Sequence, residues 1–429
     1  MTAITPLGYP QQDPPLIINE RKRADVSTEA ERYPRYRWVI LGIAWVILLC
    51  LYWSWFLIPS LASRLSPELG LTHIQYTLIF TAPVLMGIWG AITAGAAADR
   101  FGIRVVVGIA VFLGGTAGLA RAFAPSFEVM FILMCLVGLS VYGATPNLPK
   151  LVAIWFPPRQ AGLAAGFYTM AIGFGLTLGM FTGPLFRDWR AAFTYIGIAT
   201  LAVAFLWAFL ARNAPKGVEI KMPPMVSGIK RGLRSRNIWL ICIVYFLFMG
   251  TFISFSGNFP EALEIIHNIS PATAGTIASL LTGAGILGNL LVTTISDRIG
   301  LRKPFIYAAV ITIPLCLFFA WYLAPGTATW VLVCLGGIAV GSLPPIILTL
   351  PLELPEIGRE HVGGATGLIL SSMALGGFTM PLFVISPIMA AGTLEAYSTG
   401  FLVTMLLIAA AIIPALFLME TGRRGRAKR

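Results

Sequence analysis

Twelve apolar runs, each long enough to cross a lipid bilayer, most constrain what this chain can fold into. The hydrocarbon core of a bilayer is about 30 Å thick, so a spanning helix needs about 20 apolar residues. Charged residues make up 11% of the chain, whereas they make up about 25% of a soluble domain. These figures exclude a soluble globule, a disordered chain, collagen and a coiled coil. The predicted spans are 37–60, 74–97, 103–123, 127–154, 162–186, 191–211, 237–259, 274–296, 304–324, 328–350, 362–386 and 398–419.

The distribution of basic residues predicts the topology of these spans. With both termini on the cytoplasmic side, 25 of the 30 Lys and Arg residues fall in cytoplasmic segments, whereas Arg121 is among the four that fall outside. This bias follows the positive-inside rule. The net charge of +12 then reflects topology, and no nucleic-acid partner is needed to explain it. We find no cleavable signal peptide, which favours a prokaryotic inner membrane, that is, a plasma membrane.

An internal repeat divides the chain into two halves. Asp99–Arg104 matches Asp297–Arg302 at an offset of 198 residues, and Gly143 and Pro146 match later residues at the same offset. Self-similarity at a fixed offset indicates a repeated structural unit. The predicted organisation is a disordered, Pro-rich cytoplasmic tail, a six-helix half, a basic cytoplasmic linker, a second six-helix half and a basic tail, at 1–36, 37–211, 212–236, 237–419 and 420–429.

The repeated segment resembles the loop motif G-x-x-x-D-R-x-G-x-R of the major facilitator superfamily. The copy after the second span meets it fully, with Gly95, Asp99, Arg100, Gly102 and Arg104. The copy after the eighth span has Thr293 in place of the first glycine and keeps Asp297, Arg298, Gly300 and Arg302. The resemblance covers residues 37–420. It implies an all-α membrane protein of twelve transmembrane helices in two pseudo-symmetric halves, a monomer that moves a small solute by alternating access.

The resemblance also implies that these motif residues hold the cytoplasmic side closed in the outward-open state. An acid at the end of a span can meet the positive N-terminal end of a neighbouring helix, and Gly102 permits a tight turn. Arg159 and Arg359, in the links after the fourth and tenth spans, can join these gating charges. The alternative is a solvated loop that only sets topology.

In this family, spans 1, 4, 7 and 10 line the central cavity, so their polar and aromatic residues are candidates for substrate binding. Trp53 and Trp55 equally suit an interfacial aromatic belt. Lys150 is the only charge clearly within a predicted span, and three roles stay open for it: pairing with Asp99 in the gate, binding an anion, or snorkelling. The substrate-binding candidates are Tyr52, Trp53, Trp55, Tyr142, Asn147, Lys150, Tyr245, Ser254, Asn258 and Ser342.

The acidic residues constrain the mechanism, because all of them map to tails, loops or the ends of predicted spans. Proton coupling normally requires a titratable group with access to both sides. We therefore expect facilitated diffusion, exchange or electrogenic anion movement, without an intramembrane carboxylate for proton coupling. Glu353, near the inner end of the tenth span, is the best candidate for an exception.

A cavity of aromatic, hydroxyl and amide groups with one lysine suits a small or organic anion. Residues 147–157 resemble the cyanate-permease and nitrate/nitrite branches of the family, although the arginines that the nitrate branch carries in spans 2 and 8 are absent. Efflux of drugs or other amphiphiles is the first alternative, and a sensor or assembly protein on the same fold is the second. The spans lack convergent nucleophiles, bases or metal ligands, so we expect no enzyme, cofactor or metal site.

Overall fold

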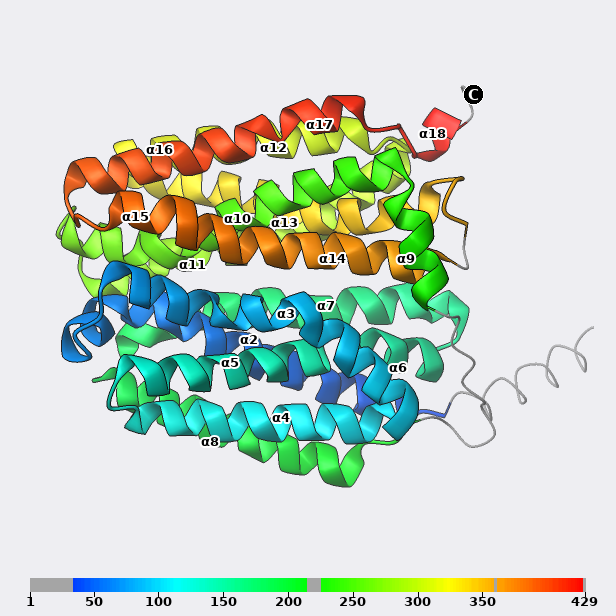
Figure 1. Ribbon diagram of the computed structural model, residues 1–429, viewed down its shortest axis with the longest axis horizontal. Helices are drawn as coiled ribbons and strands as arrows, with labels where there is room; N and C mark the ends of the chain where they lie inside the picture. Colours follow the sequence, from blue (N-terminus) through cyan, green and yellow to red (C-terminus); the bar gives the residue numbers. More distant parts are fainter. Residues whose placement is uncertain (1–33, 214–224, 359–360, 427–429) are drawn as a thin grey trace, which may run out of the picture.

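The computed structural model describes residues 34–213, 225–358 and 361–426, and the ordered elements in these ranges are helices. Twelve segments are long and apolar enough to cross a membrane, as the sequence predicts. They form two bundles that lie side by side with their helices nearly parallel (Figure 1). The predicted 1–36 tail falls almost entirely outside the described residues.

The N-terminal half contains α2 (Arg37–Glu68), α3 (His73–Phe101), α4 (Ile103–Ala120), η1 (Arg121–Phe123), α5 (Phe127–Ala144), α6 (Leu148–Trp155), α7 (Pro158–Thr182), η2 (Gly183–Leu185) and α8 (Trp189–Leu210). The linker contains α9 (Met225–Leu233). The C-terminal half contains α10 (Arg236–Ile265), α11 (Pro271–Ile299), α12 (Lys303–Tyr322), α13 (Thr327–Glu353), α14 (Val362–Thr379), the π-helix η4 (Met380–Ile385), α15 (Ser386–Met389), α16 (Leu394–Ala410), α17 (Ile412–Phe417) and α18 (Arg423–Arg426).

Short polar side chains start several of the long helices after tight loops. Thr72 and Gln75 form a capping box at the start of α3, and Asp188 accepts from the Ala191 N–H at the start of α8. Ser235 caps α10 by accepting from the Ile238 N–H. Each oxygen satisfies one of the free N–H groups that begin a helix, so the sequence sets where these spans start.

Prolines interrupt two of the spans, whereas a third helix continues through its proline. The predicted span 127–154 is broken between α5 and α6 at Pro146, and the eleventh span passes through η4 beside Pro381. Proline lacks the N–H that continues a helical ladder. Pro260 lies inside α10, and the helix nevertheless runs on to Ile265, whereas the sequence predicted an end at 259.

Close helix packing in the C-terminal half depends on glycine. A Cβ placed on Gly288 of α11 would lie 1.9 Å from the Ile338 carbonyl oxygen of α13, and one on Gly341 would lie 1.9 Å from the Gly285 carbonyl oxygen. Small residues let helix backbones approach closely in lipid. These two helices therefore form a rigid pair beside the interface with the other half.

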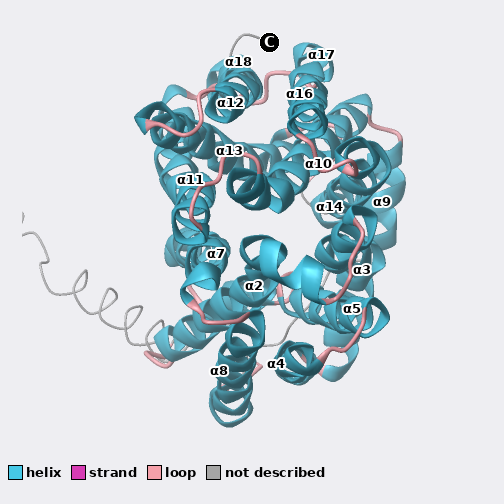
Figure 2. Ribbon diagram, turned by 90° about the vertical axis from the view of Figure 1, so that its left-hand side faces the viewer, coloured by secondary structure: helices cyan, strands magenta, loops and turns pink. Residues whose placement is uncertain are grey.

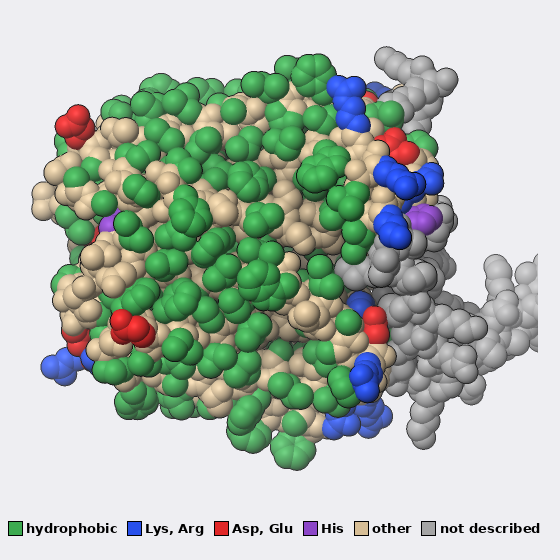
Figure 3. Space-filling view, in the orientation of Figure 1, with side chains coloured by type: hydrophobic (Ala, Val, Ile, Leu, Met, Phe, Trp, Pro, Cys, Tyr) green, Lys and Arg blue, Asp and Glu red, His purple; other side chains and the backbone are tan. Residues whose placement is uncertain are grey.

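The two ends of the bundle differ in charge. We call the end that holds α9 and the loops after Asp99 and Asp297 the linker end, and the opposite end, which holds Glu68, His73 and Glu395, the far end. Figure 3 shows hydrophobic side chains across the middle of one face and many Lys and Arg side chains at the linker end. This distribution is typical of a protein that crosses a bilayer.

The two halves are held together at the far end. Tyr76 of α3 donates to the Gly257 carbonyl of α10 at 2.6 Å, and Thr77 donates to Ser386 Oγ at 3.1 Å. Ser63 of α2 donates to Glu264 Oε2 at 2.5 Å. Figure 2 views the molecule from this end, with α2–α8 on one side and α10–α18 on the other. These contacts close the interface between the halves at the far end, and we call this region the far-end seam.

Candidate functional site

Three tyrosine side chains, two from the N-terminal half and one from the C-terminal half, lie near Tyr52. The Tyr52 hydroxyl of α2 lies within electrostatic range of those of Tyr142 (α5), Tyr168 (α7) and Tyr245 (α10). Tyr52 also lies 3.4 Å from the Thr145 hydroxyl. The ring of Tyr142 covers Gly87 so closely that a Cβ there would clash with it. The structure therefore brings the three predicted tyrosines together and adds Tyr168, which the sequence analysis missed. We call these four residues the tyrosine cluster.

The two predicted tryptophans point in different directions. Trp55 is buried and donates to the Phe80 carbonyl of α3 at 2.9 Å, beside the ring of Tyr52. Trp53 donates to Thr182 Oγ1 at 2.9 Å and lines a cavity of about 310 Å³ with Phe186 and residues of α8. That cavity lies within the N-terminal half, so Trp53 does not join the tyrosine cluster.

The remaining polar candidates are fully buried and bonded mainly to backbone. Asn147 lies at the break between α5 and α6. It donates to the Ala94 carbonyl of α3 and to the Gly143 carbonyl of α5, so it links this break to α3. Asn258 donates to the Ser254 carbonyl at 2.8 Å, and Ser342 donates to the Ala339 carbonyl at 2.7 Å. Asn147 Oδ1, Asn258 Oδ1 and Ser254 Oγ have no protein partner in the described residues, which leaves them free to bind water or solute.

Lys150 forms an ion pair with Asp99. The Nζ–Oδ1 distance is 2.9 Å, and both side chains are partly exposed at the linker end. Gly95 lies beside the ammonium, since a Cβ there would make an ordinary contact with Nζ at 3.7 Å. This is the contact that the gating alternative for Lys150 requires.

The rest of the first motif copy also bonds within its own half. Gly102 has φ of +88°, which favours glycine, and the side chain of Asn213 lies against it. Arg104 donates to the Ala208 carbonyl of α8 at 2.5 Å, and its backbone N–H donates to Asn213 Oδ1. Arg100 lies over the ring of Phe101 at 5.3 Å. These contacts tie the loop after α3 to the end of α8.

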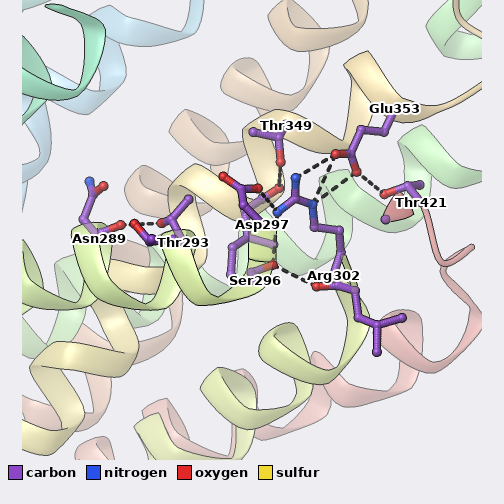
Figure 4. A network of polar contacts seen from close by, with 12 residues as sticks. Asn289, Thr293, Ser296, Asp297, Arg302, Thr349, Glu353 and Thr421 are labelled. Carbon is purple, nitrogen blue, oxygen red and sulfur yellow. Dashed lines mark hydrogen bonds and ion pairs between the residues drawn. The ribbon is translucent and has the colours of Figure 1, made fainter. Parts of the chain in front are cut away.

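The second motif copy builds a network around Arg302, a buried residue just before α12. Its guanidinium pairs with Asp297 at 2.6 Å and with Glu353 at 2.7 Å, and it also donates to Ser296 (Figure 4). Hydrogen bonding to Glu353 raises the pKa of Arg302 above its ordinary value. Glu353 also accepts from Thr421. The network joins α11 and α13 to the C-terminal segment. Its central acid is Glu353, which the sequence indicated as the best candidate for proton coupling.

The remaining gating candidates are Gly300, Arg298, Arg159 and Arg359. Gly300 ends α11 with φ of +73° and accepts from the Arg424 N–H, whereas Arg298 is exposed. Arg159 lies in the first turn of α7. Arg359 lies outside the described residues. The ion pairs of the two motif copies, Lys150–Asp99, Arg302–Asp297 and Arg302–Glu353, each stay within one half.

Arg121 is a functional candidate that the sequence analysis placed wrongly. The predicted span 103–123 contains it, whereas the count of basic residues assigned it to an outside segment. The structure places it within the third membrane-spanning segment, where it is completely buried. Its guanidinium donates to the Ser54 carbonyl at 3.0 Å and to Ser54 Oγ, and it covers the ring of Phe193 at 4.3 Å. Within the described residues, no carboxylate forms an ion pair with it. The flanking A-F-A-P-S residues resemble a loop and hid this placement.

Glu261 is a carboxylate near the end of a span that is more deeply buried than the sequence indicated. The sequence predicted that the seventh span ends at 259, but α10 continues to Ile265, and Glu261 is only 7% exposed. The residue lies in the far-end seam near Tyr76 and Tyr397. The sequence did contain a signal that the helix continues: Glu261 and Glu264 follow Pro260 at a spacing that fits one more helical turn.

Replacing Lys150 by alanine should change conformation more than stability. An exposed ion pair contributes about 0–1 kcal/mol, so we expect a small shift in the thermal unfolding midpoint. If the pair sets the balance between inward-open and outward-open forms, spin-label distances across the linker end should change while substrate affinity stays the same. Weaker substrate binding with unchanged distances would instead assign Lys150 to the substrate site.

Comparisons with known proteins agree with this geometry. A sequence model of the Major Facilitator Superfamily matches residues 44–381. A Mycobacterium tuberculosis protein named "Probable nitrate/nitrite transporter NarK2" is 25% identical, over 85% of this chain and 91% of its own length. "Probable sulfoacetate transporter SauU" of Cupriavidus necator is 23% identical, over 89% and 94%. "Probable galactarate/D-glucarate transporter GudP" of Bacillus subtilis is 24% identical, over 63% and 67%.

Solved structures share the fold. A bacterial homologue of the human lysosomal transporter Spinster, in an inward-facing and unoccupied conformation, has a TM-score of 0.72 at 15% identity, covering 89% of this chain and 96% of its own. A D-xylose–proton symporter has a TM-score of 0.69 at 19% identity, covering 90% and 99%. The matching model spans most of the chain, and the relatives are named as transporters rather than enzymes. This multi-pass membrane protein belongs to the major facilitator superfamily of transporters.

Proposed function

We propose that the protein moves a small or organic anion across the membrane by alternating access, with the substrate bound between the halves at the tyrosine cluster. The observation that carries this proposal is the convergence of hydroxyl donors from both halves, Tyr52, Tyr142 and Tyr168 from one and Tyr245 from the other. A hydroxyl can donate to an anion, and donors fixed in a water-poor site stabilise negative charge more strongly than in water.

A buried positive charge in the N-terminal half supports an anion rather than a cation. Arg121 holds a buried guanidinium against Ser54, which lies two residues beyond Tyr52 in α2. Charges in the membrane interior are costly and usually mark functional sites. The relatives are named for nitrate/nitrite, sulfoacetate and galactarate/D-glucarate, and each of these substrates is an anion.

We further propose that the linker end is cytoplasmic, which places both termini inside, in a bacterial inner membrane. The concentration of basic residues at the linker end supports this orientation. The closed far-end seam then makes this structure an inward-facing state. We propose the protein as a monomer, with no nucleic-acid partner.

The gating roles fit this state. The motif charges pair within their own halves, as in Asp99–Lys150 and Arg302–Asp297, because the cytoplasmic side is not the closed side. In the outward-open state, we propose that Arg100, Arg104 and Arg298 approach the opposite half and hold that side shut.

The test is uptake by purified protein reconstituted in proteoliposomes. Radiolabelled nitrate, nitrite, sulfoacetate and D-glucarate should be compared with neutral D-xylose, each across a concentration gradient. We expect saturable uptake of at least one anion and none of xylose. Saturable transport of neutral or cationic amphiphiles without any anion would favour the efflux alternative, and binding without flux would favour a sensor.

Removing one hydroxyl of the tyrosine cluster should weaken anion binding. A hydrogen bond to a charged group contributes about 1.5–3 kcal/mol, so Tyr52→Phe and Tyr245→Phe should each raise the anion dissociation constant roughly tenfold to hundredfold. Binding can be measured from the shift in thermal unfolding midpoint with anion concentration. Tyr195→Phe is the matched control, because Tyr195 is exposed on α8. Unchanged affinity in both cluster variants would contradict the proposed site.

A further inference from the structure

Glu261 is a buried acid that the proposed anion site does not use. It lies in α10, one residue after Pro260, within a segment that spans the membrane. The side chain is 7% exposed, and its Oε2 atom has no hydrogen-bond partner in the described residues. A buried carboxylate without compensation costs several kcal/mol, so such a group tends to be neutral.

Among the residues that the structure describes, no cation faces Glu261. The Tyr397 hydroxyl of α16 and the Tyr76 hydroxyl of α3 both lie within electrostatic range of its carboxyl group. The neighbouring acid on α10 is Glu264, which disfavours a second negative charge. His73 of α3 packs edge-on to Tyr397, with centroids 6.2 Å apart.

The remaining charged groups near α10 are directed elsewhere. Arg64 of α2 interacts with Glu264 and donates to the Phe186 carbonyl within the N-terminal half. His267 packs on Trp321 beside Tyr397, with centroids 4.6 Å apart. The charged residues of α11 and α13, such as Asp297 and Glu353, lie at the linker end. By contrast, Glu68 at the far end pairs with Arg190 and accepts from Trp189, which lowers the pKa of that exposed carboxyl.

The position of Glu261 couples it to the relative movement of the halves. One turn earlier on α10, the Gly257 carbonyl accepts from Tyr76 of the other half, and one turn later Glu264 accepts from Ser63 of the other half. A Cβ on Gly257 would lie 2.8 Å from the ring of Phe80, so the halves approach closely here. Separation of the halves at the far end must therefore expose this segment to water.

We propose that Glu261 is a proton-binding site of the far-end seam, which binds a proton when the seam closes and releases it when the seam opens. In the closed seam the carboxyl is neutral, with its proton on one oxygen. When water enters the opening seam, the O–H bond breaks, the electron pair stays on the carboxylate and the proton passes to water. The coupling of this step to solute movement rests on the proposed transport function, whereas the proton site itself does not.

The sign of the pH dependence follows from this linkage. The closed seam binds one more proton than the open seam, so lower pH favours the closed form and higher pH favours the open form. A glutamine at 261 keeps the neutral amide in place at every pH. We therefore expect Glu261→Gln to hold the seam closed over the whole range, and so to slow anion uptake at every pH.

Infrared spectroscopy tests the proton directly and needs no substrate. Purified wild-type protein at neutral pH should show the carbonyl stretch of a protonated carboxylic acid, and Glu261→Gln should lose it. Glu395→Gln is the matched control, because Glu395 is an exposed acid at the same end of the same half. Loss of the band in the control, or its absence in the wild type, would overturn the proposal, whatever anion the protein carries.

A distance measurement tests the coupling to the seam. Spin labels at exposed positions 74 on α3 and 265 on α10 report the separation of the halves at the far end, after replacement of the five native cysteines. We expect the distances of the wild type and of Glu395→Gln to lengthen as pH rises, and those of Glu261→Gln to stay short. A pH response in Glu261→Gln equal to that of the wild type, or no response in the wild type, would overturn the proposal.

Discussion

Replacing Arg302 by methionine should destabilise the protein by about 3–5 kcal/mol, the cost of removing one partner from a buried ion pair. The Arg302 side chain is 9% exposed and that of Glu353 is 15% exposed, so loss of the guanidinium leaves Glu353 in a poorly solvated site. The same change releases Ser296 at the end of α11. A large fall in the thermal unfolding midpoint of the purified protein in detergent is the expected result.

Arg298→Met provides the matched control in the same motif. Arg298 is exposed, and surface substitutions usually change stability by within about 0.5 kcal/mol. The double variant Arg302→Met/Glu353→Gln should recover part of the lost stability, because the amide removes the uncompensated charge. If Arg302→Met and Arg298→Met unfolded at the same temperature, the network would be a surface feature with no role in holding the C-terminal half together.

The membrane-spanning architecture could be predicted from the sequence because its causes are local. A run of about 20 apolar residues must span a bilayer as a helix, whatever its neighbours are. The repeat of Asp99–Arg104 at Asp297–Arg302 then divided the spans into halves. Span ends were less certain, since Pro260 suggested the end of a helix that in fact continues to Ile265. Because the predicted end lay six residues before the observed one, the burial of Glu261 was not predicted.

The candidate site could be predicted only in part, because its remaining members depend on contacts between helices. Tyr52, Tyr142 and Tyr245 were identified from the spans expected to face the cavity. Tyr168 belongs to α7, a fifth-span helix, and joins them only through tertiary packing. The burial of Arg121 also depends on contacts between helices, because its acceptors lie in α2. The sequence alone shows a charge beside a Pro-containing segment, which is typical of a loop.

Replacing Arg121 by methionine should reduce anion uptake more than it reduces stability. Burial of a guanidinium without a carboxylate is costly, and substitution of buried charge by an apolar side chain of similar volume is often neutral or stabilising. The lost bonds to Ser54 oppose this gain, so we expect the free energy of unfolding to stay within about 2 kcal/mol of the wild type. Loss of this buried charge removes its Coulomb attraction to the anion. We expect anion affinity to fall about tenfold, which corresponds to about 1.4 kcal/mol.

Two further variants separate the charge of Arg121 from its hydrogen bonds. Arg121→Lys keeps the charge and should retain part of the anion affinity. Ser54→Ala removes an acceptor while the guanidinium stays, so its affinity should remain near that of the wild type. Anion binding can be followed by thermal shift, with uptake in proteoliposomes as the second measurement. A methionine variant that binds and transports anions normally would show that Arg121 only stabilises the packing of α2. Loss of affinity in Arg121→Met alone would instead mean that this buried charge is maintained for the anion.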